Sequence, residues 1–294
     1  MAERVTILLV EDNPGDERLL MEVVKDAGTL ALSVEIRRDL ESALKSAEAL
    51  HPDIVLLDLN LPDSKGLFTF LRFRQSLPRL PVVVLTGIED EELGVQAVKE
   101  GAEDFLTKAD LSPRLLARSV RYAIERHDLR KRLQYCASHD ALTGVFNRQY
   151  FKEMIEVELA RSRRYQHAIG ILMLDIDGFK AVNDQIGHEA GDRVLRAVAD
   201  FLVREMRTVD TVIRYGGDEF LLILPETGQG VEGAAQRLRE ASAAGLRDVH
   251  EDLEEGVSVS IGASYWEEGR QITLDEAIAE ADQRMYARKR AKRS

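Results

Sequence analysis

Acidic side chains gather beside two apolar runs in the second half of the chain. Asp175 and Asp177 follow one run, and Asp218 and Glu219 stand between the glycine pair Gly216–Gly217 and the next run. Apolar runs on both sides of paired glycines predict a β-hairpin whose tight turn uses positive φ angles at the glycines. Adjacent carboxylates at a sheet rim repel each other unless a cation lies there, and a divalent metal ion is the obvious candidate. A solvated acidic turn is the alternative on this pattern alone.

The spacing of these acids suits a reaction at phosphorus. Asp175 and Asp177 are two residues apart, so a strand would point both carboxylates to the same side. Beside the predicted hairpin, Asp175 and Asp218 could share metal ions. Such ions lower the pKa of an attacking hydroxyl and neutralise a leaving pyrophosphate, as nucleotidyl transfer requires. A pair of solvated strand-end acids is again the alternative.

Four apolar runs in the first half also end in polar side chains. These are Glu11 and Asp12, then Asp58, Thr86 and Lys108. Helical segments alternate with the runs, which predicts a parallel sheet covered on both faces, with the polar strand ends at one edge. Three carboxylates, a hydroxyl and an ammonium group there indicate an aspartate that accepts a phosphoryl group beside Mg²⁺. Ordinary polar loops are the alternative.

Length and composition limit the possible classes of protein. The 294 residues suggest about two domains, and the hydrophobic fraction of 45% is ordinary for a globular chain. The net charge of −12 argues against broad nucleic-acid binding. No apolar run reaches the length of a membrane span and no signal sequence opens the chain, so we expect a cytoplasmic protein without a membrane partner. Cys136 is the single cysteine, which excludes an intramolecular disulfide.

A helix is predicted between the two acidic regions, from Arg114 to about Gln134. Ser112 and Pro113 suit its N-cap and first turn. Apolar residues recur at steps of three and four, ending in Leu129, Leu133 and Cys136, while the other positions are densely charged. The helix is either a stalk that pairs with a second copy or a solvated linker.

Residues 1–124 resemble the receiver domain of bacterial response regulators, which is a doubly wound, flavodoxin-like domain with a five-stranded parallel sheet. The resemblance implies Glu11 and Asp12 as metal acids for one Mg²⁺, Asp58 as the phosphoacceptor, Thr86 as the switch hydroxyl and Lys108 as the phosphate contact. Phe105 matches an aromatic switch position. The lysine is followed by Ala109, where the family usually has proline. A sensor histidine kinase or another phosphodonor is the implied partner.

The string Tyr-Gly-Gly-Asp-Glu-Phe at positions 215–220 is similar to the signature of the GGDEF family of diguanylate cyclases. These enzymes join two GTP molecules into cyclic di-GMP. The resemblance covers residues 140–294, with residues 125–139 as a helical linker. It implies an α/β domain with a mainly antiparallel central sheet, of the nucleotidyl-cyclase or palm-like type, and two Mg²⁺ ions in each cyclase site.

The same resemblance assigns roles by position. Its catalytic and metal positions fall on Asp175, Ile176 (through the carbonyl), Lys180, Asp218 and Glu219, and Glu219 is either a ligand or the base. Its substrate positions fall on Phe179, Asn183, Asp192, Lys289 and Arg293, of which Asn183 and Asp192 read guanine. Lys292 stands where the family usually has glycine.

A further motif matches the family's inhibitory product site. Arg207 and Asp210 have the family's offset from the glycine pair, and Arg237 is a weaker candidate for a contact from the partner side. Because the product is two-fold symmetric, the resemblance implies a homodimer through the receiver domain and stalk. We therefore predict a phosphorylation-regulated diguanylate cyclase with product feedback inhibition. The alternatives are a catalytically silent GGDEF receptor for GTP or cyclic di-GMP, and an interaction module with a vestigial cyclase.

Overall fold

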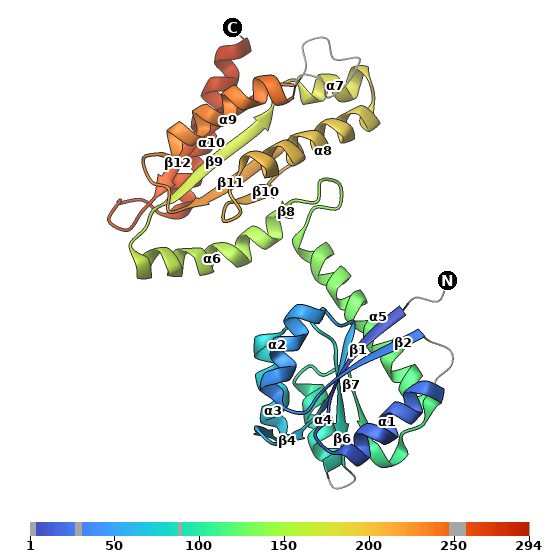
Figure 1. The fold of residues 1–294 in the computed structure, drawn as a ribbon. Helices are drawn as coiled ribbons and strands as arrows, with labels where there is room; N and C mark the ends of the chain where they lie inside the picture. The colour runs from blue at the N-terminus through green and yellow to red at the C-terminus, as the bar shows by residue number, and fades with distance from the viewer. Residues whose placement is uncertain (1–3, 27–30, 88–89, 247–256, 294) are drawn as a thin grey trace. The chain divides into compact units, whose positions relative to one another are not determined.

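The computed structural model describes residues 4–26, 31–87, 90–246 and 257–293 (Figure 1). The chain divides into two compact units, Met1–Arg132 and Leu133–Ser294. Within the described ranges, no helix is long and apolar enough to cross a membrane.

The first unit contains a five-stranded parallel sheet, as predicted. Its strands are β1 (Arg4–Val10), β2 (Ala31–Arg37), β3 (Ile54–Asp58), β6 (Val82–Thr86) and β7 (Asp104–Thr107). They lie in the order β2-β1-β3-β6-β7. Each of the three central strands contains a fully buried apolar run, because both faces of the sheet are covered; these runs are residues 7–10, 54–57 and 82–85.

Helices cover both faces of this sheet. One face packs against α1 (Pro14–Asp26) and α5 (Pro113–Ser138). The other face packs against α2 (Leu40–Leu50), α3 (Leu67–Ser76) and α4 (Glu91–Lys99). A small hairpin, β4 (Asn60–Leu61) and β5 (Ser64–Lys65), lies between β3 and α3, and a 3₁₀ turn (Lys108–Asp110) follows β7.

Helix α5 is longer than the sequence pattern predicted. It runs for 26 residues, with Ser112 accepting a hydrogen bond from the N–H of Leu115 at its start. His127 is buried, and its two ring nitrogens lie 3.2 Å from Oε1 of Glu103 and 2.9 Å from the carbonyl oxygen of Arg79. Arg130 also pairs with Glu103. These contacts attach the middle of α5 to the receiver unit.

The second unit has a mainly antiparallel sheet, again as predicted. Its strands are β8 (Phe146–Asn147), β9 (Ile169–Ile176), β10 (Thr211–Arg214), β11 (Glu219–Pro225) and β12 (Val259–Trp266). They lie in the order β12-β9-β11-β10-β8, and only the β10–β8 pairing is parallel. Strand β9 is two residues longer than predicted, so Asp175 and Ile176 belong to the strand.

Two layers of helices enclose this sheet. Helices α6 (Arg148–Tyr165) and α10 (Leu274–Arg293) cover one face, and α8 (His188–Glu205) and α9 (Val231–Gly245) cover the other. The short helix α7 (Phe179–Gln185) follows β9. Helix α10 approaches β12 so closely that a Cβ at Gly262 would lie 2.0 Å from the carbonyl oxygen of Ala281. This packing brings the end of α10 to the acidic end of β9.

Candidate functional site

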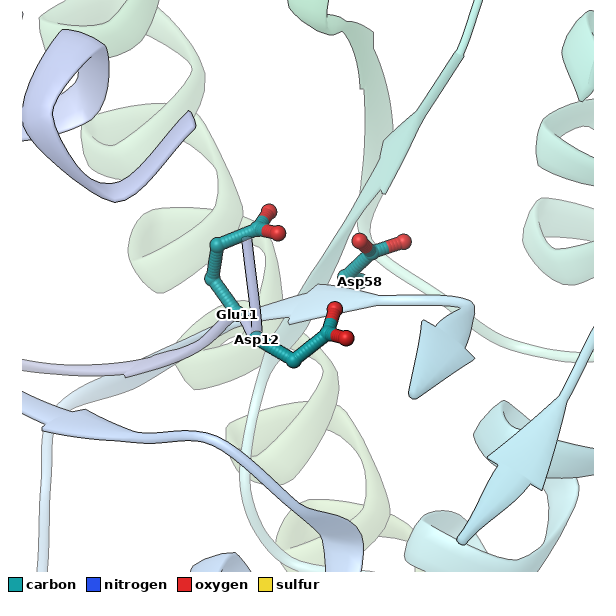
Figure 2. Close-up of side chains that lie close together, drawn as sticks. All are labelled: Glu11, Asp12 and Asp58. Atoms are coloured by element: carbon teal, nitrogen blue, oxygen red, sulfur yellow. The ribbon is translucent and has the colours of Figure 1, made fainter. Parts of the chain in front are cut away.

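The polar strand ends of the receiver unit meet at one edge of its sheet. Glu11 and Asp12 follow β1, and Asp58 ends β3. One carboxylate oxygen from each of these three residues lies within 4.8 Å of the other two. Figure 2 shows the three carboxylates around a common space.

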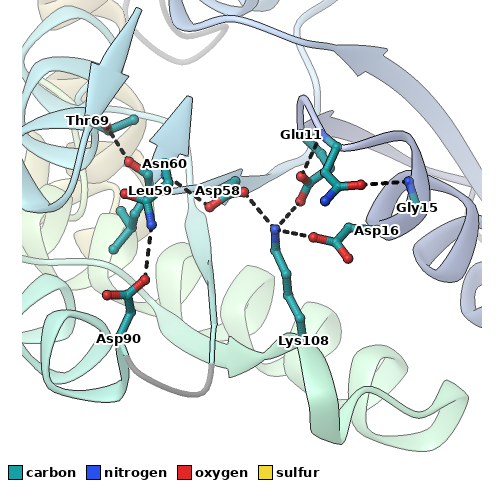
Figure 3. Close-up of polar contacts among 10 residues, drawn as sticks. Glu11, Gly15, Asp16, Asp58, Leu59, Asn60, Thr69, Asp90 and Lys108 are labelled. Carbon is teal, nitrogen blue, oxygen red and sulfur yellow. Dashed lines mark hydrogen bonds and ion pairs between the residues drawn. The ribbon is translucent and has the colours of Figure 1, made fainter. Parts of the chain in front are cut away.

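Lys108 places its ammonium group at the same point (Figure 3). Its Nζ lies 2.7 Å from Glu11, 2.8 Å from Asp16 and 2.7 Å from Asp58. The sequence reasoning gave no role to Asp16. The sequence feature that could have identified Asp16 is its position as an acid in the first turn of the helix that follows Glu11 and Asp12.

Burial controls the electrostatics of this pocket. Burial raises the pKa of Glu11 to about 7; the hydrogen bond from Lys108 opposes this rise, and the charge of Asp58 adds to it. Burial alone would lower the pKa of Lys108, but hydrogen bonds to Asp16, Asp58 and Glu11 outweigh burial and raise it. The ammonium therefore stays charged and holds the acids together.

The surroundings of Asp58 are also ordered. The N–H of Asn60 donates to Oδ1 of Asp58 at 3.0 Å, and the side chain of Asn60 donates to Asp90. The hydroxyl oxygen of Thr86 is buried, and no hydrogen-bond partner for it lies among the described residues. Phe105 packs so closely on Gly94 that a Cβ there would lie 2.6 Å from its ring.

The donor set of this pocket fits Mg²⁺. Three carboxylates converge, and hard oxygen ligands are those that Mg²⁺ takes in proteins. Glu11, Asp12 and Asp58 would hold the ion.

A second set of acids lies where β9 and β11 pair in the other unit. The antiparallel register places Glu219 opposite Asp175, and the N–H of Ile176 donates to the carbonyl of Asp218 at 3.2 Å. One end of the β9–β11 pair therefore carries all four groups: Asp175, Ile176, Asp218 and Glu219. This geometry fits carboxylate and carbonyl ligands for a divalent cation.

Helix α10 supplies a cation to this edge. Lys289 forms an ion pair with Oδ1 of Asp175, and both side chains are largely buried. Burial raises the pKa of Asp175; the hydrogen bond from Lys289 opposes the rise and the charge of Asp218 adds to it. Burial also raises the pKa of Glu219, with further contributions from Asp175 and Asp218.

Asp177 is separated from this group. Its Oδ1 accepts from Ser260 at 2.6 Å, and its Oδ2 accepts from Ser258 at 2.8 Å and from Lys292 at 2.7 Å. Burial favours the neutral acid, but the bonds from Lys292 and the two serines hold the pKa of Asp177 below its ordinary value. Asp177 thus belongs to a hydrogen-bond network with β12 and α10.

The prediction that the glycines of the hairpin turn have positive φ angles is wrong. Neither Gly216 nor Gly217 has a positive φ angle. The N–H groups of Tyr215 and Gly216 both donate to the carbonyl of Glu219, and a Cβ at Gly216 would lie 2.5 Å from Oε2 of Glu219. Glycine at 216 therefore makes room for the Glu219 side chain.

Arg214 joins this turn to the start of the unit. It donates to the carbonyl of Gly217 and to Oδ1 of Asp140, the latter at 2.9 Å. Asp140 also accepts from the N–H and hydroxyl of Thr143. The sequence reasoning assigned no role to this link, which fixes the position of the turn that carries Asp218.

Three of the predicted substrate residues, Phe179, Asn183 and Asp192, lie on α7 and α8, and the other two lie on α10. Phe179 and Lys180 open α7 directly after β9, and Lys180 is exposed. A Cβ at Gly191 would lie 2.0 Å from Oδ1 of Asn183, so the side chain of Asn183 packs on α8 at the residue before Asp192. The side chain of Arg293 lies outside the described residues.

Arg207, Asp210 and Arg237 line one pocket of about 450 Å³. The N–H of Arg207 donates to Oδ2 of Asp210 at 2.9 Å, which fixes the carboxylate. Its other oxygen, Oδ1, is buried and has no hydrogen-bond partner among the described residues. This pocket lies away from the acids at the end of β9.

Comparison with known proteins identifies both units. The family model described as "Diguanylate cyclase, GGDEF domain" matches residues 137–294, and the one described as "Response regulator receiver domain" matches residues 7–120. The response regulator PleD of Caulobacter vibrioides is 31% identical over 299 residues, which cover 98% of this chain and 64% of that protein. Diguanylate cyclase DgcS of Shewanella oneidensis is 34% identical over 54% of this chain and 51% of its own length.

A solved structure agrees with this result. The crystal structure of the coiled coil and GGDEF domain of DgcB from Caulobacter crescentus, in complex with c-di-GMP, has a TM-score of 0.52 and 29% identity. It covers 60% of this chain and 95% of that one. The chain belongs to the GGDEF diguanylate cyclase family and carries a response regulator receiver domain before the GGDEF domain. It spans less than two thirds of the length of PleD and of DgcS.

Proposed function

We propose that this chain is a diguanylate cyclase that converts two GTP into cyclic di-GMP and two pyrophosphates. The observation that carries the proposal is the edge where Asp175, Ile176, Asp218 and Glu219 meet beside Lys289. A catalytically silent receptor would have no need for all of these groups. Their presence supports the enzyme over the receptor.

Asp175, Asp218 and the carbonyl of Ile176 would hold two Mg²⁺ ions, which lower the pKa of the 3′-hydroxyl and offset the charge of the triphosphate. Glu219 is either a further ligand or the acceptor of the hydroxyl proton. Lys180, Lys289 and Arg293 would contact the phosphates.

Asn183 and Asp192 would read the guanine base. The position of the Asn183 side chain against Gly191, the residue before Asp192, supports this role. The carboxylate of Asp192 can accept from the N1 and N2 hydrogens of guanine. Adenine lacks those donors and would leave the acid unpaired.

One domain holds one GTP, so two copies must face each other for the ring to close. We propose a homodimer through the receiver domain and α5. Along α5, Tyr122, Leu129, Leu133 and Cys136 are exposed and recur at steps of seven, four and three residues. That spacing is typical of a coiled-coil seam. Phosphorylation of Asp58, with one Mg²⁺ in the receiver pocket, would reposition the two GGDEF domains.

Product inhibition is a further part of the proposal. The unpaired Oδ1 of Asp210 could accept from guanine, and Arg207 could pair with a phosphodiester or with the guanine edge. Arg237 lines the same pocket and could contact product from the other side.

The test is GTP turnover measured against protein concentration, with Mg²⁺ and with or without a small phosphodonor. We expect a rate per protein that rises with concentration and rises further with the phosphodonor. Asp58→Asn should remove the second increase, whereas Glu48→Gln, an exposed acid on α2, should keep it. A wild-type chain that binds GTP but yields no cyclic product would favour the receptor instead.

The native cysteine tests the geometry of the proposed pairing without a substitution. If two α5 helices pair in parallel and in register, mild oxidation should cross-link Cys136 to its copy. The product would appear as a dimer on a non-reducing gel, and Cys136→Ser is the control. Dimers in solution that give no cross-link would contradict this register.

A further inference from the structure

Two lysines near the end of α10 each hold one of the two acids that flank Ile176. Lys289 pairs with Asp175, and Lys292, three residues further along the same helix, donates to Asp177. Residues three apart lie on the same face of a helix. The end of α10 is therefore fastened to the end of β9 at two points.

The bond from Lys292 is part of a wider network. Its ammonium also donates to the carbonyl of Val259 on β12 at 2.9 Å. Asp177 in turn accepts from Ser258 and from the buried Ser260, and its own N–H donates to the carbonyl of Ser258. One ammonium thus links α10, β12 and the segment that leads from β9 to α7.

The bonded state of Asp177 separates its role from that of Asp175. Three donors already occupy its two carboxylate oxygens. A carboxylate in this state is a structural acceptor. It cannot turn to a new cation without giving up some of these bonds.

We infer that Lys292 is a positioning residue for nucleotidyl transfer, which acts through Asp177 to hold the last turns of α10 so that Lys289 stays at the substrate edge. The inference rests on the proposed function, because Lys289 matters there as a contact for the triphosphate. Lys292 itself touches no reacting atom in this scheme. Its loss should weaken the binding of GTP more than it slows the chemical step.

A competing role for Lys292 is to donate to the backbone carbonyls along the outer side of β12. Arg239, Arg284 and Arg270 donate to the carbonyls of Ile261, Ala263 and Tyr265 on the same strand. Lys292 continues this row at Val259. Arg284 therefore offers a matched control, because it covers the same edge without a bond to Asp177.

The experiment compares full-length Lys292→Met and Lys292→Arg with wild type. The controls are Arg284→Met, which removes another cation from the β12 edge, and Ala291→Gln, which changes an exposed neighbour on the same helical turn without removing a cation. For Lys292→Met we expect a KM for GTP about two- to fivefold higher, the range for a half-exposed ion pair, and a kcat within about twofold. Amide exchange over the last two turns of α10 should quicken. Lys292→Arg and both controls should keep a KM near that of wild type.

Adding Asp177→Asn to Lys292→Met tests the route of the effect. If Lys292 acts through Asp177, the double variant should show no further rise in KM. Additive rises, an unchanged KM in Lys292→Met, or an equal rise in either control would overturn the inference. Should wild type make no cyclic product, the proposed function fails. Calorimetry then measures the affinity of the same variants for a non-hydrolysable GTP analogue with Mg²⁺. The positioning role predicts the same ratios between variants for the dissociation constant as for KM.

Discussion

The two acidic sites of this chain each combine carboxylates with a lysine, but the two lysines contact different numbers of carboxylates. In the receiver unit, one buried ammonium, Lys108, contacts three carboxylates. In the GGDEF unit, Lys289 contacts only Asp175 of the edge acids, and no ion pair to Asp218 or Glu219 occurs among the described residues. In the first site, one internal cation offsets part of the charge of three carboxylates. The second keeps two acids available for cations that arrive with a nucleotide.

This difference fits the two kinds of ligand that are proposed for these sites. A receiver pocket that accepts a small ion and a phosphoryl group can be fully assembled in one chain, because both are compact. A site that joins two nucleotides must stay open toward a second copy. The GGDEF acids accordingly lie at one end of the paired strands β9 and β11, whereas Glu11 is fully buried.

The strongest test of the comparison removes an acid that has no internal cation. Asp218→Asn should lower the rate of cyclic di-GMP formation by at least about 100-fold, because the Mg²⁺ ions that would offset the negative charge of the transition state lose a carboxylate ligand. The measurement is chromatography of GTP reactions with Mg²⁺. Asp184→Asn, an exposed acid on α7, is the control and should keep the wild-type rate. Wild-type output from Asp218→Asn would remove the edge from the mechanism.

A second test exchanges the two lysines for methionine and measures stability. Lys108→Met leaves three acids facing one another, so it should lower the free energy of unfolding of the receiver unit by about 2–3 kcal/mol. Lys289→Met leaves one acid unpaired and should cost about 1 kcal/mol in the GGDEF unit. Chemical denaturation in the presence of a metal chelator measures both. Mg²⁺ should restore part of the stability of Lys108→Met, and equal losses would contradict the comparison.

The third test uses pH. Because the pKa of Glu11 is raised to about 7, its proton competes with Mg²⁺ below that pH. Affinity of the receiver pocket for Mg²⁺ should therefore be about tenfold lower at pH 6 than at pH 8, with most of the change near pH 7. Calorimetric titration of the Asp218→Asn variant isolates this pocket. Glu11→Gln should bind more weakly and lose this pH dependence, and an affinity that falls with rising pH would contradict the assignment.

The effect of pH on the stability of the fold has the opposite sign to its effect on the affinity for Mg²⁺. A carboxyl with a folded pKa above its unfolded value favours the folded state in its protonated form. The contribution of Glu11 to the stability of the metal-free chain should accordingly decline from about pH 4.5 to pH 7. Denaturation of wild type and Glu11→Gln in a metal chelator measures this decline, and the two proteins should differ most above pH 7.

Much of the architecture was readable in the sequence. Apolar runs such as Ile54–Leu57 are too short for core helices, and their alternation with amphipathic segments requires a parallel sheet whose carboxyl edge collects the polar ends. The grouping of Glu11, Asp58 and Lys108 follows from that topology. The antiparallel pairing of β10 with β11 was similarly implied by two apolar runs around a glycine turn.

Other features depended on contacts between distant segments. The periodicity of two put Asp175 and Asp177 together, but the approach of α10 and β12 gave each acid its own lysine. The turn at Gly216–Gly217 fits a general hairpin rule, yet its backbone is set by Arg214 and the bulk of Glu219. Asp16 became a partner of Lys108 only because the fold brings the first turn of α1 to the residue that follows β7.

The sequence by itself determined which segments are strands and helices and which strand ends carry acids, because these depend on local propensity and hydrophobic period. Only the tertiary structure decided which cation meets which acid. Long side chains such as Lys108 and Lys292 reach partners set by the packing of whole helices against the sheet, and that packing depends on contacts between residues far apart in the chain.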